Sequence, residues 1–103
     1  MNQQLNSFIL KLQAYKEVQL DYLDALYLVP ASYDADDETQ INNYWYKVGD
    51  AQEAWDRLDS FRASIQADIT DDLRIKMKLS DTHLLLKNFE NAALFHSSPP
   101  RFG

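Results

Sequence analysis

The chain has 103 residues, of which 46% are hydrophobic and 25% are charged, a balance that fits one globular domain and excludes wholesale disorder. It contains no cysteine, which excludes disulfides, thiolate chemistry and zinc–thiolate sites. The net charge is -6, and residues 31–60 hold eight acids against two bases, a field that would repel DNA and RNA and would favour a basic protein surface.

The composition predicts an all-α fold in a single domain. Two glycines and three prolines are few, which favours long helices over a turn-rich all-β domain. We expect the helical domain to cover residues 1–96, followed by a flexible tail over 97–103 that contains Pro99 and Pro100. The N-terminal segment lacks the features of a secretory signal, and no apolar run is long enough to span a membrane. We therefore expect a cytoplasmic protein with no membrane partner.

The first predicted helix runs from about Gln4 to Leu28 and ends before Pro30, because the residue preceding a proline avoids helical dihedral angles. Its apolar residues recur at steps of three and four and cover roughly 160° of the circumference, wider than the stripe of a helix with one neighbour. Leu10 and Val18 lie outside even this band. We expect two helical neighbours and a further contact at Leu10 and Val18, from this chain or another. The band comprises Leu5, Phe8, Ile9, Leu12, Tyr15, Tyr22, Leu23, Leu26 and Tyr27.

The second predicted helix begins at Asp37 and returns antiparallel to the first, because the connection over residues 31–36 is short. The carboxylate of Asp37 can cap the helix, with Gln40 reaching back as in a capping box. Apolar residues then continue in a heptad-like seam to Ile69. Gly49 leaves two alternatives open, a continuous helix or a break and restart at that residue.

Residues 73–79 allow two interpretations. Apolar and basic residues alternate strictly from Leu73 to Leu79, which is typical of a strand with one exposed face. Residues 44–48 are the only candidate partner strand, which gives a minority α+β interpretation with a two-stranded sheet. We favour a helix, capped by Thr70 or Asp71, because the residues of this segment are good helix formers.

The last predicted helix covers Asp81 to Phe95 and also has more apolar surface than one neighbour can cover. Leu85, Leu86, Phe89, Ala92 and Ala93 share one face, whereas Leu84, Leu94 and Phe95 lie off it. The fold expected from these elements is a long antiparallel helical hairpin plus a third, C-terminal helix, a helical bundle that dimerisation could complete.

Two groups of residues are candidate partner-binding sites besides Leu10 and Val18. Tyr44, Trp45 and Tyr46 are consecutive, so on a helix they cannot all enter one core and at least one should reach the surface. Tyrosine and tryptophan are enriched at interface hot spots. The second group is the acidic cluster of Asp34, Asp36, Asp37 and Glu38. It lacks the glycine and the closing glutamate of a calcium loop, so we interpret it as a surface for a basic partner.

No pattern of residues specifies a reaction. His83 and His96 are the only histidines and are too far apart to share a helical turn, and no Glu-x-x-His pair for a di-metal site occurs. Asp81 and His83 could form an acid–base pair, but no nucleophile accompanies them. We therefore expect no catalytic residue, no metal and no cofactor.

These patterns favour a non-enzymatic helical protein-interaction module, such as an adaptor, a chaperone-like protein or an inhibitor. It would bind a protein partner with a basic or apolar surface and form a homodimer, with no direct nucleic-acid contact. The alternative is an acidic nucleic-acid mimic that blocks a DNA- or RNA-binding protein. A small hydrolase or metal enzyme is the third hypothesis.

Overall fold

The computed structural model describes residues 3–102, which form four α-helices and no strand. Helix α1 spans Gln3–Tyr27, α2 spans Glu38–Asp68, α3 spans Asp71–Leu79 and α4 spans His83–Phe95. The expected all-α class is confirmed, with four helices instead of three, because residues 71–79 form a helix of their own.

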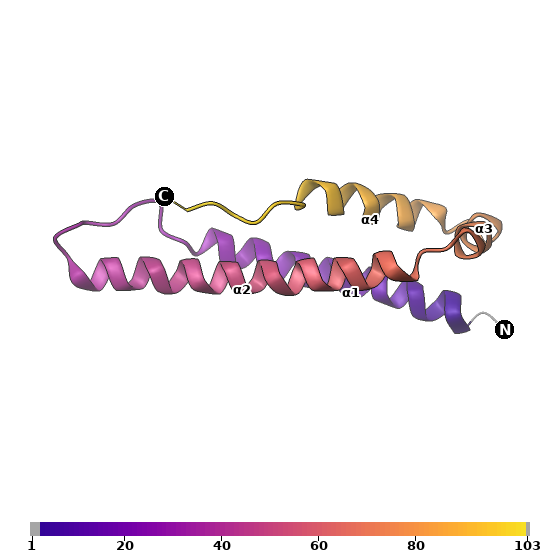
Figure 1. Ribbon diagram of the computed structural model, residues 1–103, viewed down its shortest axis with the longest axis horizontal. Helices are drawn as coiled ribbons and strands as arrows, with labels where there is room; N and C mark the ends of the chain where they lie inside the picture. The colour runs from indigo at the N-terminus through magenta and orange to yellow at the C-terminus, as the bar shows by residue number, and fades with distance from the viewer. Residues whose placement is uncertain (1–2, 103) are drawn as a thin grey trace.

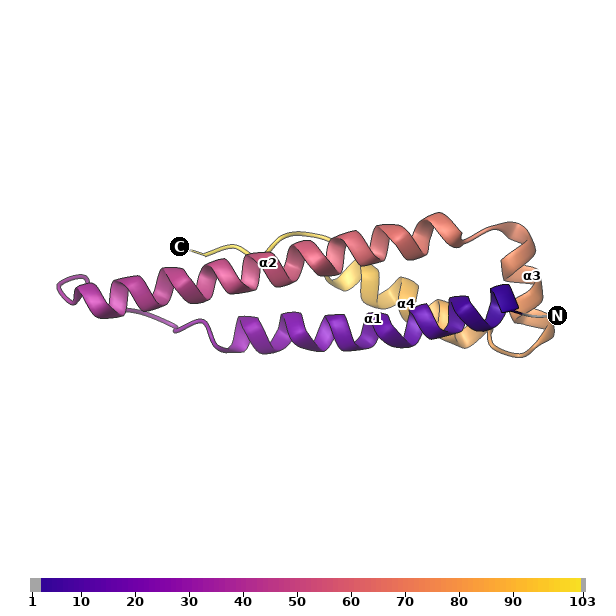
Figure 2. The same ribbon diagram turned by 90° about the horizontal axis from the view of Figure 1, so that it is seen from below.

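The helices form an elongated bundle that measures 61 × 20 × 18 Å. α1 and α2 lie antiparallel, α4 packs on this hairpin in the same direction as α1, and α3 crosses the end where α1 begins (Figures 1 and 2). The apolar band of α1 therefore has the two helical neighbours that its width predicted. Side chains of all four helices meet in one core: Leu5, Phe8, Leu12, Tyr15, Tyr22, Ala54, Leu58, Ile65, Leu73, Met77, Leu86, Phe89 and Ala93.

α4 covers only part of the hairpin. It ends beside Tyr22, whose ring centroid lies 5.6 Å from that of His96. Trp55 Nε1 donates to the His96 carbonyl oxygen at 3.3 Å, which holds this end of α4 on α2. Beyond this level the helical layers consist of α1 and α2 alone. The hairpin tip has its own small set of buried side chains: Tyr44, Val48 and Ala51.

The start of α2 confirms the predicted cap and changes one detail. Asp37 is the N-cap, and its carboxylate accepts from the backbone N–H groups of Thr39 and Gln40 at 3.0 and 3.3 Å. Gln40 does not close a capping box on the Asp37 amide. Its Oε1 accepts from the Asp34 backbone N–H at 2.9 Å, because the Asp37 N–H already donates to the Asp34 carbonyl oxygen at 3.0 Å.

α2 continues through Gly49 without interruption, so of the two alternatives the structure has the continuous helix. Capping residues after Gly49 are not needed, because Val48 and Ala51 are buried on either side of it and tie both turns to the hairpin. The glycine does not have a positive φ angle, and a Cβ added to it would meet nothing within 4 Å.

We expect Gly49→Ala to raise the free energy of unfolding by about 1 kcal/mol, because alanine loses less backbone entropy than glycine in a helix interior. For a domain of this size that corresponds to a rise of about 4–8 °C in Tm, measurable by thermal unfolding followed by circular dichroism. Ala63→Gly, at an exposed position of the same helix, is the reverse control and should lower Tm by a similar amount. A Gly49→Ala variant with a lower Tm would contradict an unstrained helix at this position.

α3 shows how an alternating pattern becomes a helix. Thr70 is its N-cap, with the hydroxyl accepting from the Leu73 N–H at 3.1 Å. Leu73 and Met77, four residues apart, face the core, whereas Ile75 and Leu79 are 58% and 84% exposed. Helical spacing therefore buries only half of the alternating apolar residues, and no strand over 44–48 is present to pair with them.

α4 begins at His83, two residues later than expected. The reason is the end of α3, where Asp81 adopts a left-handed backbone with φ of 61°. The Thr82 N–H then donates to the Met77 carbonyl at 2.8 Å and the Asp81 N–H donates to the Lys78 carbonyl at 3.2 Å, the hydrogen bonds of a Schellman motif. A residue in this conformation cannot start the next helix.

The tail after α4 is extended and follows α2. Pro99 and Pro100 line an open cavity together with Gln52, Trp55 and Asp56. The expected flexibility of residues 97–103 stays a prediction, and Gly103 lies outside the described residues.

Candidate functional site

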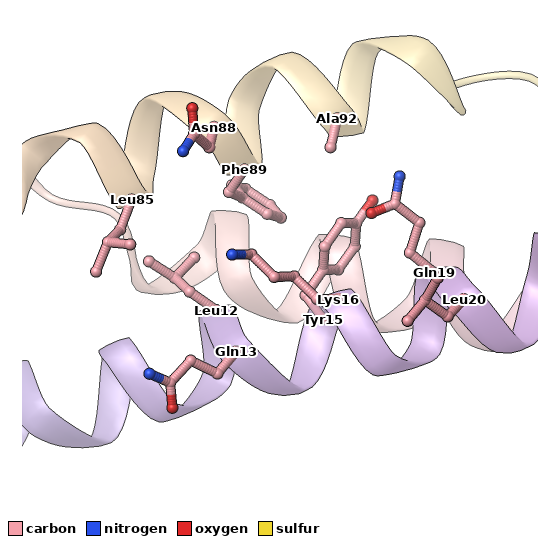
Figure 3. Close-up of a pocket in the computed structure, with 10 residues that line it drawn as sticks. All are labelled: Leu12, Gln13, Tyr15, Lys16, Gln19, Leu20, Leu85, Asn88, Phe89 and Ala92. Carbon is pink, nitrogen blue, oxygen red and sulfur yellow. The ribbon is translucent and has the colours of Figure 1, made fainter.

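An open groove lies between the parallel helices α1 and α4 (Figure 3). Its volume is about 380 Å³. Figure 3 shows the short side chain of Ala92 on α4 next to Gln19 of α1, so the two helices do not fill the space between them. Its lining residues are Leu12, Gln13, Tyr15, Lys16, Gln19, Leu20, Leu85, Asn88, Phe89 and Ala92.

The lining of the groove is mainly apolar, with a few polar groups. Tyr15 and Phe89 pack edge to face, with ring centroids 4.9 Å apart, and leucines flank them. The polar groups are three side-chain amides and the Lys16 ammonium, and the lining residues include no carboxylate, histidine or hydroxyl nucleophile other than the phenol of Tyr15. An apolar floor with a few polar groups at its edges is typical of a recognition surface.

The Tyr15 hydroxyl is buried, and no described residue forms a hydrogen bond with it. Burial raises the pKa of this phenol above its ordinary value of 10.0, with a smaller opposing effect from Arg62 and a further raising effect from Asp59. A phenol with a raised pKa stays protonated at neutral pH, so Tyr15 cannot act there as a general base.

The three consecutive aromatic residues divide between core and surface. Tyr44 is buried, with its ring 4.7 Å from Tyr33 and 5.1 Å from Trp45. Trp45 and Tyr46 are 49% and 68% exposed, so two of the three reach the surface where at least one was expected. Tyr44 supports Trp45 from inside the hairpin, so of the three predicted partner-binding aromatic residues it is the one that the structure does not place on the surface.

The two outlying residues of α1 also differ from each other. Leu10 is 64% exposed and remains a candidate contact. Val18 is half-buried and packs against the core, where it lines a shallow cavity with Phe61 of α2. The further contact predicted for Val18 is therefore made largely within the chain.

The acidic cluster lies at the hairpin tip, and two of its carboxylates shape the tip. Asp34 Oδ1 accepts from the Asp36 backbone N–H at 2.9 Å, and Asp37 caps α2. Asp34, Asp36 and Glu38 are exposed and Asp37 is half-buried. Within this cluster, the side chains of Asp36 and Glu38 are the two that make no hydrogen bond in the described structure.

The histidines lie apart from the groove. His83 Nδ1 is 3.9 Å from Asp81 Oδ1 on the surface, and His96 stacks with Tyr22 at the end of α4. Residues 3–102 contain no group of three or more histidines and carboxylates that could hold a metal ion. No helix in that range is long and apolar enough to cross a membrane.

The groove and its edge residue Leu20 were not predicted from the sequence. Leu20 is 59% exposed, and its spacing from Leu23 and Tyr27 by three and four residues was the available signal for an apolar line. Leu23 and Tyr27 belong to the predicted apolar band of α1 but are 39% and 89% exposed, because no helix of residues 3–102 covers this end of the band. The position of Leu85 and Asn88 opposite this line depends on how α4 docks, which no local pattern specifies.

The fold and the groove define an elongated all-α helical bundle with an open groove between α1 and α4. Comparison with protein-family models, with curated proteins and with solved structures finds no significant match to this chain. Its function therefore has to be inferred from its own residues.

Proposed function

We propose that the chain is a non-enzymatic helical protein-interaction module that binds a protein partner through exposed apolar helix faces, helped by its acidic middle segment. The observation that carries the proposal is the open groove between α1 and α4, together with large apolar side chains left exposed elsewhere on these two helices. Monomeric proteins rarely expose contiguous apolar patches of more than a few hundred Å² unless these bind something. Those side chains include Leu20, Leu23, Tyr27, Leu84, Leu94 and Phe95.

A cytoplasmic location and a homodimer belong to the same proposal. The dimer is supported by Leu94 and Phe95, which are 75% and 85% exposed at the end of α4. The basic side chains of α3 do not supply a charged dimer contact with the acids of a second copy. Arg74 already pairs with Glu90 at 3.2 Å and Lys76 with Asp72 at 3.0 Å within the chain.

The acidic nucleic-acid mimic is the second candidate. Its support is the exposure of Asp34, Asp36 and Glu38 at the hairpin tip, where the side chains of Gln40 and Asp34 accept hydrogen bonds from the loop backbone. Against it, Asp34 and Asp37 already accept backbone N–H groups, which leaves fewer carboxylates free to imitate phosphates.

The test is capture of partners from an extract of the source organism, with the mass of the purified chain measured by sedimentation equilibrium. We expect the chain to enrich a specific protein, and Leu20→Glu with Leu23→Glu to lose it, because charges on the apolar face oppose docking. The chain alone should have twice its mass of 12.0 kDa. Sedimentation equilibrium is preferred because a rod 61 Å long elutes early from a sizing column.

The control variant Asp36→Asn with Glu38→Gln separates the two candidates, because it removes two charges and keeps both loop-forming aspartates. The interaction module predicts that this variant retains the partner at physiological salt, and the mimic predicts its loss. A monomeric chain that enriches the same proteins with and without the apolar face would contradict the proposal.

A further inference from the structure

The groove between α1 and α4 continues past the end of α4 as a line of exposed apolar side chains. Leu20 lies at the groove, and Leu23 and Tyr27 follow at steps of three and four, so the three side chains share one side of α1. They are 59%, 39% and 89% exposed. α4 ends beside Tyr22, so no helix of residues 3–102 covers this line, which we name the apolar stripe.

The length of this surface matches one helix. From Leu12 in the groove to Tyr27 at the end of the stripe, α1 rises by roughly 23 Å, about four helical turns. An amphipathic helix lying along it would place apolar side chains at i, i+3 or i+4, and i+7 between α1 and α4. The groove is too small for a whole helix, and its volume of about 380 Å³ suits the side chains alone.

A line of acids runs beside the apolar stripe. Glu17, Asp21 and Asp24 follow one another at steps of four and three, and all three are exposed. None of them forms an ion pair within residues 3–102. Lys16 lines the groove, and the helical spacing places it and the three acids on opposite sides of Leu20.

We propose that the groove and the apolar stripe bind an amphipathic helix of another protein whose lysines or arginines face Glu17, Asp21 and Asp24. This inference rests on the proposed interaction function and adds the site and the chemistry of the partner. Two lines of unpaired acids would face each other if two copies packed antiparallel through this stripe, so the charges favour a basic partner over a second copy. The homodimer proposed above would use the Leu94 and Phe95 surface.

The probe is a synthetic helical peptide of about 18 residues, roughly 27 Å long, with leucines on one face and lysines elsewhere. The matched probe has the same leucines and glutamates in place of the lysines. Binding to the full chain is measured by the fluorescence anisotropy of each labelled peptide. We expect the lysine peptide to bind at least about tenfold more tightly than the glutamate peptide, with a difference that shrinks as salt is raised.

Two pairs of variants locate the site. Leu20→Glu should weaken the lysine peptide at least about tenfold, whereas Leu10→Glu, the same change on α1 at 64% exposure but outside the groove, should not. Joint replacement of Glu17, Asp21 and Asp24 by their amides should remove most of the salt dependence. Amides at Asp36 and Glu38 should not, because these residues lie at the hairpin tip.

The possible failures can be told apart. Equal binding of both peptides, or equal loss with Leu10→Glu and Leu20→Glu, overturns the groove as a site for a basic helix. If Trp45→Ala abolishes peptide binding and Leu20→Glu does not, the docking site is at the hairpin tip and the interaction function stands. The capture experiment with the Leu20→Glu and Leu23→Glu variant tests the interaction function separately, because it uses native proteins and not the peptides.

Discussion

Phe89→Ala is expected to lower the free energy of unfolding by about 3–5 kcal/mol, the usual range for deleting a buried aromatic ring. Phe89 is 4% exposed and its ring packs edge to face on Tyr15, 4.9 Å between centroids, at the joint between α4 and the hairpin. The loss is a large share of the 5–15 kcal/mol that is typical of whole domains. Urea unfolding followed by circular dichroism and by tryptophan fluorescence measures it, because Trp55 touches the end of α4 through its bond to His96.

The matched control is Phe95→Ala on the same helix. Phe95 is 85% exposed, so its removal opens no cavity and should change stability by about 0.5 kcal/mol or less. Comparable losses in the two variants would show that α4 is not held on the hairpin by the Phe89 face. If Phe89→Ala lowers the stability measured by tryptophan fluorescence but not the stability measured by circular dichroism, α4 opens as a separate unit while the hairpin stays folded.

Tyr15→Phe is expected to raise the free energy of unfolding by about 1 kcal/mol at neutral pH, because it removes a buried hydroxyl for which residues 3–102 provide no hydrogen-bond partner. The ring stays in place and keeps its contacts with Phe61 and Phe89. Tyr27→Phe is the matched control: its side chain is 89% exposed, and the same change should be neutral there. A Tyr15→Phe variant that is less stable than the parent would mean that the hydroxyl is hydrogen-bonded in solution.

Tyr15, together with Tyr22, should also make the free energy of unfolding fall at alkaline pH. Burial raises the pKa of Tyr15 and of Tyr22 above the ordinary value of 10.0. Above pH 10 the unfolded chain releases these protons first, so the native state then binds more protons than the unfolded state and stability falls as pH rises. The contribution of the two buried, protonated phenols to stability is fully present below pH 10 and is lost as the pH rises through their raised pKa values. Tyr15→Phe should reduce this alkaline loss in urea titrations at successive pH values, and Tyr22 accounts for part of the loss that remains.

Local patterns predicted most of the helical structure. The end of α1 before Pro30 and the caps at Asp37 and Thr70 involve residues within about four positions of each other, so sequence spacing is enough to recognise them. The predicted site was only partly located. Trp45 and Leu10 are exposed as their positions suggested, but Tyr44 is buried because Tyr33 of the connecting loop packs on it.

The sequence by itself determined the approximate bounds of α1, α2 and α4 and that their apolar surface exceeds the needs of one neighbour, because both depend on side-chain periodicity along a single helix. It left residues 73–79 open between a helix and a strand. Only the tertiary structure decided that α2 runs unbroken through Gly49, that the Tyr15 hydroxyl has no described partner, and that Leu20 borders an open groove. The last two of these features depend on where α4 docks along α1. Docking is settled by contacts between residues some 70 positions apart, such as Tyr15 and Phe89 with ring centroids 4.9 Å apart, whose pairing no local spacing encodes.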